Sequence, residues 1–179
     1  MVYVFLADGF EEVEALTPID ILRRAEIEVL TAGVGKKEII GAHNITVKTD
    51  ILSSDVVAEE AEMVVLPGGW PGTPNLQADT NVQKAIDVMV SNDKYIGAIC
   101  AAPMILGEKG LLKGKNATCF TGFEDRLIGA NYNGEPVCVD GKIITARSAG
   151  VALDFAFELV RVLKGDETVI SLKEKLLCK

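Results

Sequence analysis

The fold of this chain is decided by the stretch YIGAICAAPMIL at Tyr95–Leu106. It opens as an apolar run after a turn signal at Asn92-Asp93, and such a run predicts a short buried strand. The alanines that follow favour a helix, and Pro103 suits a first helical turn because its missing N–H would have no partner there. Cys100 is therefore expected where a strand turns into a helix, as in the strand–nucleophile–helix turn of hydrolases.

Two alternatives follow for the side chain of Cys100. A helix that begins beside it would present free N–H groups and the positive end of its dipole, which favour the thiolate over the thiol. Against a reactive thiol stands the ordinary role of cysteine as a small buried hydrophobe. The spacing within this stretch leaves both alternatives open, so the rest of the chain has to decide between them.

Length and composition predict one globular domain over residues 1–179. Hydrophobic residues make up 49% and charged residues 25% of the chain, which is ordinary for a soluble protein. A net charge of −8 disfavours nucleic acid and anionic membrane surfaces as partners. No apolar run approaches the roughly 20 residues that a membrane span needs.

The N-terminal segment and the cysteines indicate a reducing, cytoplasmic location. Residues 1–12 lack a basic region and contain Asp8, so no secretory signal is expected. The four cysteines form no CxxC pair, which predicts free thiols. Because His43 is the only histidine, no His/Cys metal site is expected, and no dinucleotide or phosphate-loop motif points to a cofactor.

Short apolar strands alternate with helical patterns along the first two-thirds of the chain, which predicts a parallel sheet with helices on both faces. Strands are expected at residues 2–7, 27–31, 38–40, 45–48, 63–66, 95–99, 116–120, 136–140 and 142–145, the last two as a hairpin. Helices are expected at residues 11–24, 82–90, 101–107, 151–163 and 166–177.

Three features fall at the carboxyl ends of predicted strands, where ligands bind in sheets of this kind. They are the turn from Asp8 to Glu14, the Gly68-Gly69 loop and Cys100. Together they would supply a thiolate nucleophile, backbone N–H groups for an oxyanion and a carboxyl group for proton transfer. A proline later in the same helix removes the donor from the Glu14 carbonyl and distorts that turn. The alternative for Glu14 is an ordinary solvated carboxylate.

Four motifs carry a resemblance to a known family: FEEVEALTPIDILRRA at 10–25, VVLPGG at 64–69, AICAAP at 98–103 and TARSAG at 145–150. In their order and spacing the chain resembles the ThiJ/PfpI superfamily, and within it the YajL-like branch of DJ-one proteins, the parkinsonism-associated protein deglycases. The resemblance covers nearly the whole chain. It implies a flavodoxin-like three-layer sandwich with a mainly parallel central sheet, similar to class I glutamine amidotransferases, and a homodimer.

The resemblance also implies roles for individual residues. Cys100 matches the family's nucleophilic, easily oxidised cysteine, and Glu14 matches the carboxyl group that hydrogen-bonds to its sulfur and transfers protons. The N–H groups of Gly69 and Ala101 match the donors to the oxyanion. Positions that the family uses around the pocket or the dimer contact fall near Arg24, His43 and Arg147.

Two differences from the wider superfamily limit the reactions that we expect of this chain. Protease-like members and the glutamine amidotransferases have histidine directly after the cysteine, where this chain has Ala101. Many deglycase-branch members place another histidine where this chain has Phe120, as in the YajL-like group. Peptidase and amidotransferase activities are therefore not expected, and Glu14 would carry the proton transfer alone.

The predicted function is a cysteine-dependent glyoxalase or protein deglycase that acts, without a cofactor, on methylglyoxal or on glycated protein in oxidative and carbonyl stress. The alternative is a redox sensor or chaperone whose Cys100 oxidises to a sulfinate without physiological turnover. An inert flavodoxin-like binding module is a third hypothesis, and it leaves Cys100 and the Gly68-Gly69 loop unexplained.

Overall fold

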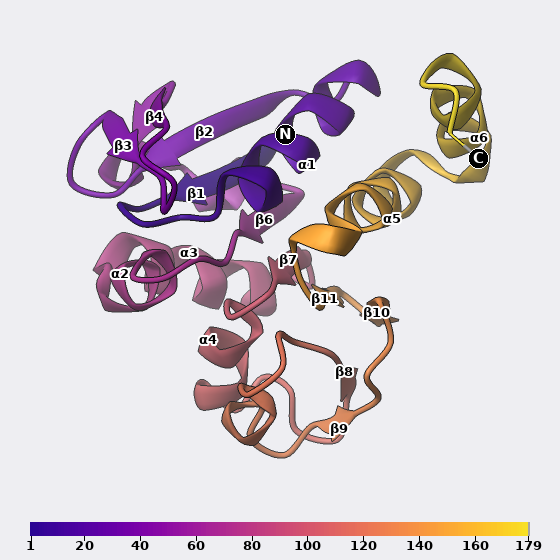
Figure 1. Ribbon diagram of the computed structural model, residues 1–179. Helices are drawn as coiled ribbons and strands as arrows, with labels where there is room; N and C mark the ends of the chain where they lie inside the picture. Colours follow the sequence, from indigo (N-terminus) through magenta and orange to yellow (C-terminus); the bar gives the residue numbers. More distant parts are fainter. Residues whose placement is uncertain (179) are drawn as a thin grey trace.

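Seven strands form the central sheet of the computed structural model, which describes residues 1–178 (Figure 1). From edge to edge the strands are β10 (Val137–Asp140), β11 (Ile143–Ala146), β7 (Tyr95–Ile99), β6 (Met63–Leu66), β1 (Val2–Leu6), β2 (Val29–Gly33) and β5 (Ile51–Leu52). Neighbouring strands are parallel, except that β10 runs antiparallel to β11. The predicted, mainly parallel sheet is confirmed.

Helices cover both faces of this sheet (Figure 1). On one side lie α1 (Glu12–Arg24), α5 (Ala152–Lys164) and α6 (Asp166–Lys175); on the other lie α2 (Gly72–Ala78), α3 (Thr80–Ser91) and α4 (Pro103–Glu108). Successive side chains of β1 point to opposite faces of the sheet. Val2, Val4 and Leu6 pack in the core under α1 and α5, whereas Tyr3 and Phe5 pack in the core on the other face. The expected flavodoxin-like three-layer sandwich is confirmed.

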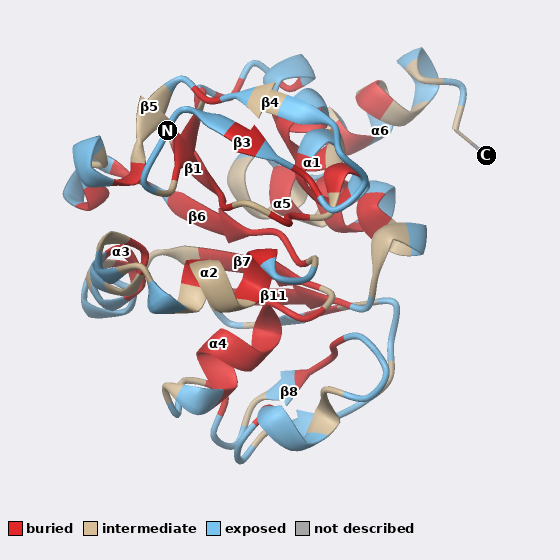
Figure 2. Cartoon of the chain, turned by 60° about the vertical axis from the view of Figure 1, so that its left-hand side comes forward, coloured by how far each residue is buried: buried red, intermediate tan, exposed pale blue. Residues whose placement is uncertain are grey.

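The centre of the sheet is the most deeply buried part of the described chain. Figure 2 shows β1, β6, β7 and α4 almost wholly buried, while the outer faces of the surrounding helices are exposed. Strands buried on both faces are continuous apolar runs, and this explains why MVVL at Met63–Leu66 carries no polar residue. The sheet is therefore a rigid support for the loops and side chains at the ends of its strands.

The predicted strand at 116–120 is wrong in length. Only Asn116–Ala117 (β8) is a strand, and it pairs in parallel with Asn131–Tyr132 (β9) outside the central sheet. The following residue is held by a side chain instead, since the Thr118 N–H donates to Thr145 Oγ1 at 3.0 Å. An apolar run favours extended backbone, but it does not specify which strand the backbone pairs with.

Two smaller differences concern β2 and α2 (Gly72–Ala78), and the expected excursion after β2 is present. Strand β2 begins at Val29 rather than residue 27, because the Ile27 N–H still donates to the Leu22 carbonyl in the turn that ends α1. Helix α2 was not predicted. The expected excursion after β2 is the hairpin of β3 (Glu38–Ile40) and β4 (Thr46–Lys48), which stands apart from the central sheet.

Within residues 1–178, no helix has both the length and the hydropathy that crossing a membrane requires.

Candidate active site

The order of the strands gathers three loops at one edge of the sheet. β1 and β6 are neighbours, but the chain leaves β1 toward β2 on one side and leaves β6 toward β7 on the other. Strand order reverses between β1 and β6, and ligands bind outside the carboxyl ends of strands at such a point. The turn after β1, the Gly68-Gly69 loop after β6 and Cys100 after β7 all lie there.

Cys100 has a left-handed backbone, with φ of +65°, directly after the last residue of β7. This conformation is sterically costly for a residue with a Cβ, and it persists only where neighbours hold it. Two hydrogen bonds do so: the Cys100 N–H donates to the Ala146 carbonyl at 2.9 Å, and the Phe120 N–H donates to the Cys100 carbonyl at 2.8 Å. The sharp turn separates Cys100 from α4, which begins at Pro103.

Glu14 lies in the first turns of α1 and its side chain is only 1% exposed, which excludes the solvated-carboxylate alternative. Its Oε2 accepts a hydrogen bond from the Gly68 N–H at 3.1 Å. The Ala149 N–H also donates to this carboxyl group, which in addition shares a hydrogen bond with the Cys100 thiol. Burial with these partners fixes Glu14 beside the sulfur.

Gly68 is the residue that lets Glu14 and Cys100 meet. A Cβ on Gly68 would lie 2.6 Å from the Cys100 Cβ and 2.6 Å from Glu14 Oε2, closer than atoms can pack. Gly69 has a φ of +96°, a conformation that favours glycine. The adjacent glycines after β6 are therefore required for two different reasons, close approach at the first and backbone conformation at the second.

Burial and proximity shift the pKa values of both groups. Burial raises the pKa of Glu14 to about 7, against hydrogen bonds from Cys100, Gly68 and Ala149. Burial and the neighbouring Glu14 carboxylate raise the pKa of the Cys100 thiol to about 12, while the N–H groups of Ala101 and Gly69 oppose the rise. The expected thiolate is thus not favoured while Glu14 is ionised, because the nearby negative charge outweighs the backbone donors.

The backbone donors that the sequence analysis assigned to Gly69 and Ala101 both lie at the sulfur. Each N–H group is hydrogen-bonded to the Cys100 side chain and lowers its pKa. They come from two different elements, the loop after β6 and the turn after β7. Two preset N–H groups next to a nucleophile form the kind of site that holds a negative oxygen during carbonyl chemistry.

The structure does not bring Arg24 or Arg147 to Cys100. Arg24 lies ten residues beyond Glu14, about 15 Å along the helix axis, and pairs with Asp20 at 2.7 Å on the surface. Arg147 follows β11, is exposed, and donates to the Gly134 carbonyl at 3.3 Å. Arg147 is close to the site in the sequence, but its guanidinium group is bound to the Gly134 carbonyl and not to the sulfur.

His43 lies at the tip of the β3–β4 hairpin and is fastened to α1. Its Nδ1 is 2.9 Å from Glu12 Oε2 and 3.6 Å from Glu11 Oε2, and its backbone N–H donates to Glu12 Oε1 at 2.8 Å. These contacts raise the pKa of His43 and lower that of the buried Glu12. Glu11, Glu12 and His43 come together as possible metal ligands, but both oxygens of Glu12 already accept hydrogen bonds from the hairpin.

Sequence analysis missed three residues around the site. Ala149 supplies an N–H to Glu14, and its presence in the TARSAG motif was the available signal. Trp70 and Phe123 place their rings 5.9 Å apart beside the Gly68-Gly69 loop, a contact that joins segments far apart in the sequence. Local sequence patterns do not predict a contact between such distant segments.

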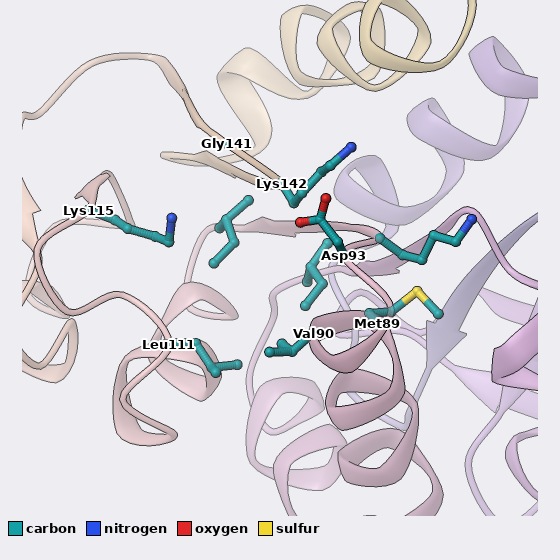
Figure 3. A pocket seen from close by; sticks show the side chains of 10 residues that line it. Met89, Val90, Asp93, Leu111, Lys115, Gly141 and Lys142 are labelled. Atoms are coloured by element: carbon teal, nitrogen blue, oxygen red, sulfur yellow. The ribbon is translucent and has the colours of Figure 1, made fainter.

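A separate pocket of about 420 Å³ lies at the opposite edge of the sheet, where β7 and β11 begin (Figure 3). Met89, Val90 and Leu111 line one side of it, and Asp93 and Lys142 lie on the other (Figure 3). Because Cys100 follows the other end of β7, this pocket has no part in the site around the thiol.

The fold and the site define a class: flavodoxin-like α/β proteins in which a strained cysteine meets a buried carboxyl group at the switch in strand order. The sequence model of the DJ-1/PfpI family matches residues 1–162. The chain belongs to the DJ-1/PfpI family, which confirms the resemblance found from its motifs.

Known relatives cover nearly the whole of the chain. Protein DJ-1 homolog B of Arabidopsis thaliana is 33% identical over 178 residues, which are 98% of this chain and 41% of that protein. The chain thus spans less than half the length of the two Arabidopsis relatives that it matches. A deglycase of Pyrococcus abyssi is 33% identical over 91% of this chain and 99% of its own length.

Two further comparisons extend the likeness. A glutathione-independent glyoxalase of Caenorhabditis elegans is 29% identical over 93% of this chain and 89% of its own length. The solved structure of oxidized DJ-1 from Toxoplasma gondii superposes with a TM-score of 0.92 at 32% identity, over 98% of this chain and 97% of that one. The fold is therefore shared along nearly the full length of both chains.

Proposed function

We propose that this protein is a cysteine-dependent glyoxalase or protein deglycase that acts on methylglyoxal or on its adducts with protein. The observation that carries the proposal is the hydrogen-bonded pair of Cys100 and Glu14, with the N–H groups of Gly69 and Ala101 at the sulfur. The names of two relatives, a deglycase and a glutathione-independent glyoxalase, support the same chemistry.

The reaction begins with transfer of the thiol proton. The ionised carboxylate of Glu14 takes the proton of Cys100, and the neutral carboxyl group no longer opposes a thiolate. The sulfur then adds to the aldehyde carbon of methylglyoxal, a C–S bond forms, and the carbonyl electron pair moves onto oxygen. The N–H groups of Gly69 and Ala101 stabilise this oxyanion until Glu14 returns the proton to it and leaves a hemithioacetal.

Glu14 performs the second proton transfer as well. Its carboxylate removes the proton from the former aldehyde carbon, and the resulting enediol receives a proton on the adjacent carbon, which gives a thioester of lactate. Water hydrolyses the thioester, so that methylglyoxal and one water become lactate and the Cys100 thiol is restored. A carboxyl group with a pKa of about 7 is suited to give and take protons near neutral pH.

The residues around the pair support this chemistry over peptide hydrolysis. The position after the nucleophile is Ala101, and Phe120 donates only its backbone N–H to Cys100. His43, the only histidine in the chain, is engaged with Glu12. Glu14 is therefore the one side chain that we assign to proton transfer at the sulfur.

Turnover of methylglyoxal by the purified protein tests the proposal. We expect consumption of methylglyoxal with equal formation of lactate, and a loss of at least about 10³-fold in kcat for Cys100→Ser. Cys178→Ser is the matched control, because Cys178 is also a partly exposed free thiol and lies near the end of the chain. If the native protein forms no lactate, the glyoxalase assignment is wrong.

The redox-sensor alternative uses the same groups and is less well supported. Its sulfinate would occupy the position that we give to the oxyanion, whereas the relatives' names point to turnover. Intact-mass spectrometry after mild peroxide treatment tests the alternative, since a sensor gains two oxygens on Cys100. Without that gain, the sensor alternative has no chemical basis.

We also infer a homodimer of single-domain chains in the cytoplasm, with no nucleic acid partner. The family resemblance supports the dimer, and the net charge of −8 supports the lack of a nucleic acid partner. Size-exclusion chromatography with light scattering measures the mass in solution, and a monomer would contradict the inferred assembly.

A further inference from the structure

Three aromatic residues lie on the segments that adjoin Cys100 and have no part in the chemistry described above. Trp70 follows Gly69 directly and is 58% exposed, and Phe120 is 45% exposed. The ring of Phe123 packs against that of Trp70. We call these three residues the aromatic mouth. Exposed aromatic surface next to a nucleophile binds apolar parts of a ligand, because rigid rings offer large contact area.

A closed circuit of contacts ties the aromatic mouth to the nucleophile. The Gly69 N–H is hydrogen-bonded to the Cys100 sulfur, and the Phe120 N–H donates to the Cys100 carbonyl. A turn brings Phe123 back, since its N–H donates to the Phe120 carbonyl at 3.1 Å. The Phe123 ring then reaches Trp70, which is bonded to Gly69, and the circuit is complete.

These contacts hold the segments that carry the aromatic mouth next to Cys100. The two segments that carry the aromatic mouth are held to opposite ends of one residue, the sulfur and the carbonyl of Cys100. A substituent on an aldehyde carbon bonded to that sulfur would therefore lie near the segments that carry Trp70 and Phe120. A methyl group has too little surface to cover rings that are about half exposed, whereas a planar aromatic group stacks on them or meets them edge to face.

We propose that the aromatic mouth selects α-oxoaldehydes with a planar, apolar substituent on the ketone carbon, and that arylglyoxals are the preferred substrate class. The inference rests on the proposed function, because the same thiol attacks the same aldehyde carbon. With phenylglyoxal the C–S bond forms at the aldehyde carbon, a proton moves from that carbon to the ketone carbon, and water releases mandelate. Phenylglyoxal and one water thus become mandelate.

The test compares kcat/KM for phenylglyoxal and methylglyoxal, measured as formation of mandelate and lactate. We expect the native protein to prefer phenylglyoxal about tenfold, the discrimination that a small apolar contact provides. Trp70→Ala and, independently, Phe120→Ala are expected to lower this ratio about fivefold, whereas Trp70→Phe retains most of it. Ile170→Ala, at a residue that is 57% exposed on α6, is the matched control and leaves the ratio unchanged.

Each outcome decides. A kcat/KM ratio near one in the native protein, or an unchanged ratio in both alanine variants, contradicts the proposed selection by the aromatic mouth. Turnover of methylglyoxal in the same experiment would still support the proposed function. If neither aldehyde is consumed, the proposed function is wrong. The fluorescence of Trp70 then tests separately whether the aromatic mouth binds a planar apolar group. Trp70 is the only tryptophan of the chain, so its emission is unambiguous. Quenching by mandelate but not by lactate supports the mouth, and equal or absent quenching overturns it.

Discussion

The thiol of Cys100 and the carboxyl group of Glu14 share a hydrogen bond across Gly68, which has no side chain to separate them. The first follows β7 and the second lies in α1, so two elements that are not neighbours in the sequence supply the pair. Burial raises the pKa of both groups, and the Glu14 carboxylate raises that of the Cys100 thiol further, whereas the hydrogen bond from Cys100 lowers the pKa of Glu14. The thiol and the carboxyl group are thus in direct contact, as proton transfer between them in the proposed glyoxalase reaction requires.

Replacing Glu14 by glutamine should abolish most of the turnover and leave the fold intact. The amide oxygen of Glu14→Gln can still accept the hydrogen bond from Gly68, but the amide cannot take a proton from carbon. We expect kcat for methylglyoxal to fall by about 10² to 10⁴-fold, the range for loss of a general base. Exposed Glu60→Gln is the control. Full activity of Glu14→Gln would show that another group moves the proton.

The stability of the protein should depend on pH through Glu14. The folded state raises the pKa of this carboxyl group from 4.5 to about 7, so folding favours the protonated form. Its contribution to stability is complete below pH 4.5 and is lost as the pH rises through about 7. The loss is about 3 kcal/mol for a shift of this size in a group that is 1% exposed.

Urea unfolding at several pH values between 4.5 and 8 measures this effect. The quantity to compare is the free energy of unfolding of the native protein minus that of Glu14→Gln, because the other titrating groups are common to both. This difference should fall as the pH rises. A difference that does not change with pH would mean that Glu14 keeps an ordinary pKa in the folded protein.

Substitution of Gly68 by alanine tests the close approach on which the pair depends. The backbone of Gly68 is not in the left-handed region, so any penalty comes from the contacts of the new Cβ with Cys100 and Glu14. We expect a loss of about 1–3 kcal/mol in the free energy of unfolding, as for other overpacked sites, with loss of turnover. Gly150→Ala is the control for stability, since its Cβ would meet only Ser148 Oγ at 3.9 Å. Equal stability of the two variants would contradict the predicted clash.

The pKa of His43 should report on the contact between the β3–β4 hairpin and α1. The hydrogen bond and negative charge of Glu12 raise this pKa, with a further contribution from the charge of Glu11. In Glu12→Gln we expect the pKa to fall toward its ordinary value, while exposed Glu38→Gln on the same hairpin leaves it unchanged. NMR titration of the single histidine resonance gives the value directly. An unchanged pKa in Glu12→Gln would show that the hairpin tip is not fastened to α1 in solution.

Much of this fold follows from local sequence patterns. Continuous apolar runs identify β1, β6 and β7, and the turn from strand to helix at Cys100 is visible in AICAAP. Local patterns fail where a partner at long range decides the outcome. Residues 118–120 are apolar enough for a strand, yet Thr118 is bound by the Thr145 hydroxyl and the strand stops at Ala117.

The sequence by itself determined the family, the layered α/β fold and the candidate nucleophile with its carboxyl partner, because these depend on motifs and on the spacing of apolar residues. Tertiary structure alone decided the electrostatics. Burial raises the pKa of Glu14 and of Cys100, and the Glu14 carboxylate raises that of Cys100 further, whereas the position of Cys100 before a helix had suggested a lowered pKa. Desolvation and the distance between charges depend on three-dimensional packing, and no pattern along the chain encodes them directly. The contact between Trp70 and Phe123 likewise depends on three-dimensional packing.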